Sequence, residues 1–198
     1  SLGTSYVTKQ DVSREIVDRF EVTFTLAVES TLVAVVFGTV MGILAAVHQG
    51  SVLDNISMVI ALVGAAMPGF WIGLLLSILF ALKLGWFPAS GWGDFSHTVL
   101  PCLSLAIGSA GTIARQTRSA MLEVIRQDYI TTAKAKGVSR IVIICSHALR
   151  NALMPIVTSA GMTLAWLIGG VVVTETVFSI PGLGMYMVSA INKREKSL

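Results

Sequence analysis

The sequence predicts an all-α membrane protein, a polytopic bundle of transmembrane helices. Its 198 residues are 54% hydrophobic and only 13% charged, and their mean hydropathy is +0.79. A soluble domain carries about 25% charged residues, so lipid rather than water is expected to cover much of this chain. Four long apolar runs supply the spanning helices. Seven of the fourteen Lys and Arg residues lie between Arg115 and Arg150, which is typical of a cytoplasmic loop.

The first apolar run covers residues 22–47 and follows a polar lead-in at 1–21. At 1.5 Å per residue it reaches roughly 39 Å, enough to cross a hydrocarbon core of about 30 Å. Gly38 and Gly42 form a GxxxG pattern, which either brings another helix close or reflects how common glycine is in membrane helices. Glu29 is the one acid within the run. We expect its carboxylate either to face a polar pathway or to reach headgroup water.

The second run covers residues 56–82, with Pro68 and Gly69 near its middle. Proline removes an intrahelical hydrogen bond, so the sequence predicts a kink there, which either shapes a cavity wall or is a passive bend. The segment 83–97 mixes turn-forming residues with Trp86 and Trp92. This composition predicts a loop at the membrane–water interface.

The third run covers residues 99–121, and the basic segment 122–151 follows it. The fourth run covers 152–173, with Pro155 expected in its first turn, where proline is tolerated. Residues 175–198 leave the membrane and begin a further helix that stops at the end of the chain. Within them, the Pro-Gly-Leu-Gly segment starting at Pro181 is either a re-entrant or docking loop or an ordinary turn.

The orientation follows from the bias in Lys and Arg, which places the basic segment 122–151 inside. Counting outward from it, 83–97 and 175–198 lie outside, 48–55 lies inside, and the lead-in 1–21 lies outside. The sequence carries no visible signal peptide, and we expect a complete protein to add one span at each end.

The basic segment retains helical periodicity, which predicts two short helices separated by a hinge at Gly137. Gly137 suits a helix C-terminus and Ser139 a helix N-cap. The apolar positions are Leu122, Ile125, Ile130 and Ala133 before the hinge, and Ile141, Ile144, Cys145, Ala148 and Leu149 after it. The pair is either an amphipathic element resting on anionic lipid or a docking element for a partner protein.

Several chemistries find no support in the sequence. The basic segment suits a cytoplasmic loop better than a nucleic-acid site, and no nucleic-acid partner is predicted. The three histidines lie on different loops, so no metal site or other cofactor is predicted. The chain has no phosphate loop of the GxxxxGK[ST] type. It also lacks a nucleophile–base pair inside an apolar run, which argues against a membrane enzyme. Cys102 and Cys145 occupy unlike surroundings, so we expect no disulfide.

Ordered motifs along nearly the whole chain resemble those of binding-protein-dependent ABC transporter permeases, in the branch that serves dipeptides, oligopeptides, nickel and glutathione. The central motif covers residues 128–137 and continues at 147–155, where it looks like the coupling loop of these permeases. The other matching positions are Asp54, residues 67–71, 84–88, 100–101, 115–118 and 175–184. No one of these motifs identifies the family alone, but the ordered set of motifs is specific for it.

Two features depart from the family pattern. The general permease motif begins Glu-Ala-Ala, whereas this chain has Thr131, Thr132 and Ala133 at those positions. The peptide branch commonly lacks that glutamate, so the departure favours the branch. Family members also continue through a further span after the segment near Asn192, whereas this sequence stops at Leu198.

The resemblance implies the helix bundle of a type I ABC importer permease, with a transmembrane core at 22–174 and a cytoplasmic coupling-helix pair. It implies a multi-pass protein of a bacterial or archaeal plasma (inner) membrane. Its implied partners are a second permease subunit, ABC ATPase subunits that hydrolyse the ATP, and an extracytoplasmic solute-binding protein. The cargo is expected to be a dipeptide, an oligopeptide or a related small solute, with nickel and glutathione as alternatives. A channel or secondary transporter is the rival class, but neither needs a long cytoplasmic hinge.

The resemblance also implies the residues that couple the permease to its ATPase. They are Tyr129, Thr132, Ala133, Lys134, Ala135, Lys136, Gly137, Arg140, His147 and Arg150. Ala133 and Ala135 are small enough for close approach, and Gly137 permits a sharp turn. Glu29 and Pro68 are the candidate pathway residues.

Overall fold

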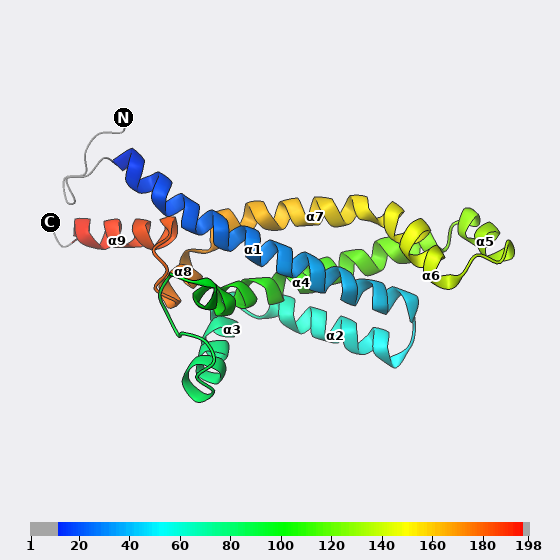
Figure 1. Ribbon diagram of the computed structural model, residues 1–198, viewed down its shortest axis with the longest axis horizontal. Helices are drawn as coiled ribbons and strands as arrows, with labels where there is room; N and C mark the ends of the chain where they lie inside the picture. The colour runs from blue at the N-terminus through cyan, green and yellow to red at the C-terminus, as the bar shows by residue number, and fades with distance from the viewer. Residues whose placement is uncertain (1–11, 196–198) are drawn as a thin grey trace. The chain divides into compact units, whose positions relative to one another are not determined.

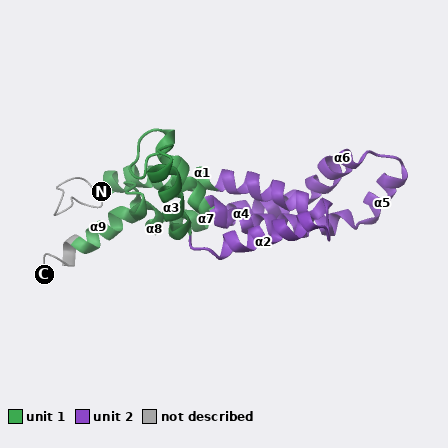
Figure 2. Cartoon of the chain, turned by 90° about the horizontal axis from the view of Figure 1, so that it is seen from below, with its two compact units in different colours: residues 1–30, 69–105, 164–198 green, residues 31–68, 106–163 purple. Residues whose placement is uncertain are grey.

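The computed structural model describes residues 12–195, with side chains described as far as Asn192, and these residues form helices joined by short loops. Part of the predicted lead-in, residues 1–11, and the last residues of the predicted final helix, 196–198, lie outside the described part. Two compact units divide the chain (Figure 2). Unit 1 comprises residues 1–30, 69–105 and 164–198, and unit 2 comprises 31–68 and 106–163. Three long helices contribute to both units.

The first half of the chain forms four helical elements (Figure 1). They are α1 (Val12–Val47), α2 (Val52–Ala66), α3 (Gly69–Leu76) and the π-helical η1 (Ser77–Lys83). The predicted second run is thus not one kinked helix. Met67 has extended backbone angles and ends α2, and the chain turns sharply before α3 begins. Because Pro68 has no N–H and disfavours a helical residue before it, a break rather than a kink results.

The second half begins with α4 (Phe95–Ile125), which contains Pro101. The shorter elements α5 (Asp128–Ala135), α6 (Arg140–Val142) and η2 (Ile143–Ala148, π-helical) follow it. Then come α7 (Leu149–Gly170), α8 (Val172–Val177) and α9 (Leu183–Glu195). Within the described residues, three helices are long and apolar enough to cross a membrane. The bent pair α2 with α3 and η1 makes a fourth if it counts as one span.

The expectation for Pro155 was wrong. The helical stretch from Arg140 runs without interruption to Gly170, so Pro155 lies inside a helix and not in its first turn. No glycine or proline between Arg140 and Met154 ends the helix, and the stretch includes the π-helical η2. The span therefore begins within the basic segment.

Close backbone packing holds α1, α2 and α4 together in unit 2. A β-carbon on Gly38 would lie 2.7 Å from the carbonyl oxygen of Ala110, and one on Gly42 would lie 2.5 Å from that of Ala114. Both distances are too short for a real side chain, so the GxxxG pattern is used for contact between α1 and α4. A β-carbon on Gly111 of α4 would likewise lie too close to the carbonyl oxygen of Ala61 of α2.

Unit 1 has its own core around the segment that follows α8. Phe178 and Ile180 of that segment are fully buried, and so are Leu26 of α1 and Leu100 of α4 in the same unit. The ring of Phe178 fills the space beside Gly73 of α3. The predicted interface loop joins the same core, because the amide of Gly91 donates a 2.8 Å hydrogen bond to the carbonyl of Phe178.

Candidate functional site

The turn between α5 and α6 is centred on Gly137, as the sequence predicted. Its φ angle is 78°, in the left-handed region that favours glycine. The amide of Gly137 donates to the carbonyl of Lys134 (3.0 Å), and the amide of Val138 donates to that of Ala133 (3.2 Å). This pair of bonds is a Schellman motif, which satisfies the last carbonyls of α5. Ser139 then takes the extended conformation of an N-cap before α6, although its side chain makes no capping bond.

The outer surface of this turn is open. Ile130 is fully buried and anchors α5, and Ala133 is half-buried. Around the turn, Thr132, Lys134, Ala135, Lys136 and Gly137 are all exposed. A β-carbon built on Gly137 would meet no atom within 4 Å. The α5–α6 turn thus presents two lysines and small side chains with nothing packed over them.

The helix after the turn buries only part of the stripe predicted for it. Ala148 is buried and Ile144 and Leu149 are half-buried, as predicted, but the other two positions are open. Ile141 is 74% exposed and Cys145 is exposed, whereas Ile143 and Ala148 are buried. The reason is the π-helical winding of η2, in which the amide of Leu149 bonds the carbonyl five residues earlier, at Ile144. This winding rotates the buried face by about one residue relative to an α-helix.

A small apolar cluster joins this region to the long helices of unit 2. It consists of Ala46 from α1, Met121 from α4, Ala148 from η2 and Ala152 from α7, all buried. Beside it lies a cavity of about 500 Å³. Its lining residues are Ala46, Val47, Ile125, Lys134, Val138, Arg140, Ile143 and Ile144. The segment therefore packs on the long helices through this cluster and the partly buried hydrophobic residues around it, with a cavity alongside.

Polar contacts fix the remaining predicted coupling residues. Asn151 donates a 2.8 Å hydrogen bond to the hydroxyl of Tyr129, which is 43% exposed, and a 2.9 Å bond to the carbonyl of His147. The guanidinium of Arg140 donates to the carbonyl of Val47, the last residue of α1, at 3.0 Å. Arg150 is exposed. The structure thus brings all of these residues onto one segment of unit 2.

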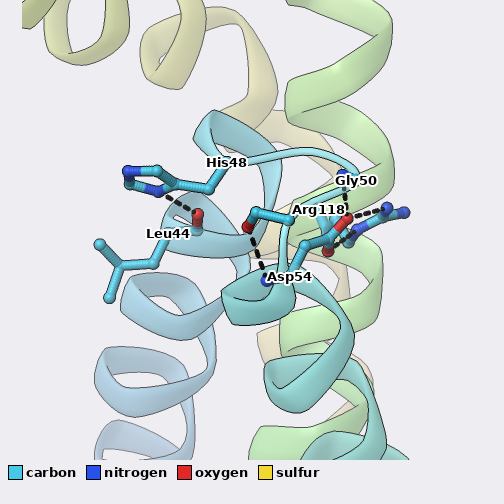
Figure 3. A network of polar contacts seen from close by, with 6 residues as sticks. Leu44, His48, Gly50, Asp54 and Arg118 are labelled. Carbon is cyan, nitrogen blue, oxygen red and sulfur yellow. Dashed lines mark hydrogen bonds and ion pairs between the residues drawn. The ribbon is translucent and has the colours of Figure 1, made fainter.

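A second polar site joins α2 to α4 (Figure 3). The carboxylate of Asp54 accepts hydrogen bonds from Nε of Arg118 at 2.6 Å and from its Nη2 at 2.7 Å. It also accepts one from the amide of Gly50 at 3.0 Å. Asp54 is only 2% exposed, and its own amide bonds the hydroxyl of the N-cap residue Ser51. Both charged residues stood in the motifs that resemble the permease family, but no pattern in the sequence pairs them.

The two candidate pathway residues differ in their surroundings. Glu29 is half-buried in α1, and one of its carboxylate oxygens is buried without a hydrogen-bond partner among the described residues. Pro68 is exposed, and it separates α2 from α3. An unpaired buried carboxylate oxygen is costly, so Glu29 is the more informative of the two.

Sequence reasoning missed a buried acid in unit 1. Glu175 is 0% exposed and accepts a 2.5 Å hydrogen bond from the hydroxyl of Thr23 and a 2.9 Å bond from the amide of Met185. Its carboxylate fills the space beside Gly182, and the amide of Leu183 donates to Thr23. Thr23 and Glu175 together cap the N-terminus of α9. The available signal was an acid next to the apolar run at 171–173.

The loop at 83–97, between the predicted second and third spans, contains an acid that accepts hydrogen bonds from two neighbouring side chains. The hydroxyl of Ser96 (2.8 Å) and the ring of His97 (2.5 Å) bond the carboxylate of Asp94. These contacts hold the pKa of Asp94 below its ordinary value. Among the described residues, no group of His, Cys, Asp or Glu could hold a metal ion, and Cys102 and Cys145 are free thiols.

This fold, an all-α bundle with a helix pair between two spans, is that of an ABC importer permease. A chain of the MetNI methionine ABC transporter, solved in inward-facing conformations, matches it with a TM-score of 0.71. The match covers 86% of this chain and 77% of that chain at 23% sequence identity. The predicted fold class is thereby confirmed.

The chain belongs to the family of binding-protein-dependent transport system inner membrane components, whose model matches residues 38–198. It is 42% identical over 194 residues to the glutathione transport system permease protein GsiC of Pectobacterium atrosepticum. It is also 42% identical over 202 residues to a Brucella abortus protein provisionally named as a peptide transport system permease. These matches cover 98% of this chain and 63% and 64% of the two relatives. The predicted family and its peptide and glutathione branch are confirmed.

Proposed function

We propose that this chain is the permease subunit of an ATP-driven importer and forms the translocation pathway together with a second permease subunit. The observation that carries the proposal is the open α5–α6 turn on a chain of this family. A channel or secondary transporter would not need an exposed, preformed element of this kind. The proposal also includes the predicted topology, with residues 122–151 in the cytoplasm.

The α5–α6 turn docks into a groove on the ATPase in this proposal. Ala133 and Ala135 allow close approach, and Gly137 makes the sharp turn. Lys134 and Lys136 pair with acids at the rim of the groove, although each exposed pair contributes only about 0–1 kcal/mol. Tyr129 and Thr132 flank the turn on α5, and Arg140, His147 and Arg150 support it from the following helix.

The chain supplies no nucleotide site of its own in this proposal. Its sequence contains no phosphate loop, so ATP binding and hydrolysis belong to the partner ATPase subunits. A rigid helix pair can follow the motion of such a partner and displace the spans attached to it. The cavity of about 500 Å³ beside the apolar cluster leaves space for that displacement.

The cargo is a small peptide-like solute, glutathione or a short peptide, delivered by an extracytoplasmic binding protein. The names of the two relatives favour this class over nickel. Nickel gains no support from the histidines, which lie on separate loops. The loops at 83–97 and 178–184 face the binding protein. Glu29 and Pro68 belong to the pathway, where an otherwise unpaired carboxylate can meet a polar cargo or water.

A crosslinking experiment in the assembled transporter tests this function. A photoreactive group placed at Ala135 should crosslink to the ATPase subunit, because Ala135 is exposed beside the turn. The same group at Trp166, which is exposed on α7 within the predicted span, is the matched control and should not. Absence of any ATPase crosslink from Ala135, or labelling of Ala135 from the outer side only, would refute the docking.

A further inference from the structure

The Asp54–Arg118 ion pair is more than a surface contact. Both terminal oxygens of the carboxylate are bonded, in a two-point geometry with Nε and Nη2 of the guanidinium (Figure 3). The amide of Gly50 supplies a third bond to Oδ2. Two-point pairing of this kind fixes both the distance and the angle between the two side chains. The pair therefore sets the register of α2 against α4.

Stability alone is a weak reason for such a pair. The Asp54 side chain is 2% exposed and the Arg118 side chain is 28% exposed, so both charges lose part of their hydration. Apolar side chains of similar volume often stabilise a protein equally well. The contact between α2 and α4 is already maintained by the approach of Gly111 to Ala61 and of Gly64 to Ile107. A pair that adds little to this packing but fixes geometry is suited to transmitting a displacement.

The position of Arg118 connects the pair to the predicted coupling segment, residues 122–151. Arg118 lies seven residues, about two turns, before α4 ends at Ile125. One turn after Arg118, Met121 packs in the apolar cluster against Ala148 of η2. A single short stretch of α4 therefore contacts the coupling segment on one side and the start of α2 on the other.

The turn that joins α1 to α2, just before Asp54, is also contacted directly by the coupling segment. Its first end, Val47, accepts the hydrogen bond from Arg140 of α6. Its other end carries Asp54 in the first turn of α2. The turn that joins α1 to α2 is thus held by one cation from the coupling segment itself and by another from the helix that leads into it.

We propose that Asp54 and Arg118 are positioning residues that carry displacement of the coupling segment to α2. The inference rests on the proposed function, in which an ATPase moves the α5–α6 turn. The pair touches neither ATP nor cargo. Its loss should abolish both the stimulation of hydrolysis by the binding protein and the uptake of cargo, while leaving the ATPase bound.

The experiment uses the full permease with its partner permease and ATPase subunits, reconstituted in proteoliposomes with the binding protein. For Arg118→Gln, we expect normal ATPase co-purification and an unchanged KM for ATP. Binding-protein-stimulated hydrolysis and uptake should both fall about tenfold or more, which corresponds to about 1.4 kcal/mol. Arg118→Lys keeps the charge but not the two-point geometry, so its stimulated hydrolysis and uptake should lie between those of Arg118→Gln and wild type.

Further variants test whether the pair transmits displacement to α2 or only stabilises the fold. Arg126→Gln removes the same charge from an exposed residue directly after α4, away from the pair, and it should behave as wild type. The exchange of Asp54→Arg with Arg118→Asp restores opposite charges and should recover part of the coupling. If Arg118→Gln does not insert, the double replacement Asp54→Leu with Arg118→Met removes the charges at similar volume and should insert but remain uncoupled.

The outcomes distinguish this inference from the proposed function. If the wild-type permease binds no ATPase, the proposed function fails. If the ATPase binds and Arg118→Gln, or the apolar pair, still couples hydrolysis to uptake, only the inference about Asp54 and Arg118 fails. Loss of ATPase binding in Arg118→Gln would also overturn it, because the pair would then belong to the docking element.

Discussion

Thr23 donates a 2.5 Å hydrogen bond to the carboxylate of Glu175, a residue 152 positions later in the sequence. Both are buried, and together they cap the start of α9 through the amides of Leu183 and Met185. Arg19, one helical turn before Thr23, bonds the carbonyl of Pro181 at 3.0 Å. One face of α1 therefore holds the segment that follows α8.

Thr23→Val should destabilise the protein by about 1–3 kcal/mol, because the Glu175 carboxylate and the Leu183 amide lose a buried partner. Thermal unfolding of the detergent-solubilised protein measures this loss. Glu21→Gln changes an exposed residue two positions earlier and is the matched control, with no expected effect. Equal stability of Thr23→Val and wild type would mean that water replaces the hydroxyl and that the cap is not structural.

Gly137→Asp should abolish transport-coupled ATP hydrolysis without preventing membrane insertion. The left-handed backbone tolerates Asp and Asn better than most residues, so the turn itself should survive. The new carboxylate would then face the acids that we propose at the groove rim. Gly137→Asn has the same shape without the charge and should keep more activity. Wild-type coupling in Gly137→Asp would show that the docking assignment is wrong.

Gly42→Ala should destabilise the helix bundle by about 1–3 kcal/mol, because the new methyl group would overlap with Ala114 and Thr117 of α4. Gly161→Ala is the control, since a β-carbon there meets no atom within 4 Å. That replacement should be neutral or slightly stabilising. A chemical unfolding curve in mixed micelles compares the two, and equal stabilities would contradict the close packing of α1 on α4.

A cysteine at Glu29 should react with a membrane-impermeant thiol reagent in at least one state of the transport cycle, if Glu29 lines the pathway. The assay needs Cys145→Ser, because Cys145 is an exposed thiol, whereas Cys102 is buried. The control is Phe37→Cys, at a position of the same helix that is 65% exposed within the predicted span, and it should stay unlabelled. Protection of the cysteine at position 29 in every transport state would remove Glu29 from the pathway.

The sequence predicted the fold class because hydropathy and charge bias depend on the membrane rather than on fine packing. It also predicted the Gly137 turn, since the left-handed conformation needs one particular residue type. It did not predict the break at Gln127, because the apolar positions Leu122, Ile125, Ile130 and Ala133 continue across it. These positions belong to two helices, α4 and α5.

The site was less predictable where it depends on distant pairs. Asp54 and Arg118 are 64 positions apart, and no local periodicity connects a residue of one helix to a residue of another. Glu175 lies in a segment predicted to be outside the membrane, where an acid is ordinary. The π-helical winding of η2 has no distinctive residue composition, so the buried face was predicted only in part: Ile141 and Cys145 were wrongly included and Ile143 was missed.

The Schellman turn at Gly137 is closed entirely by bonds of its own backbone. It therefore has its final shape before any partner arrives, and association need not pay to order it. Under the proposed function, docking of the ATPase on this turn therefore needs no folding step, and the contact can be released and remade in each cycle of ATP hydrolysis.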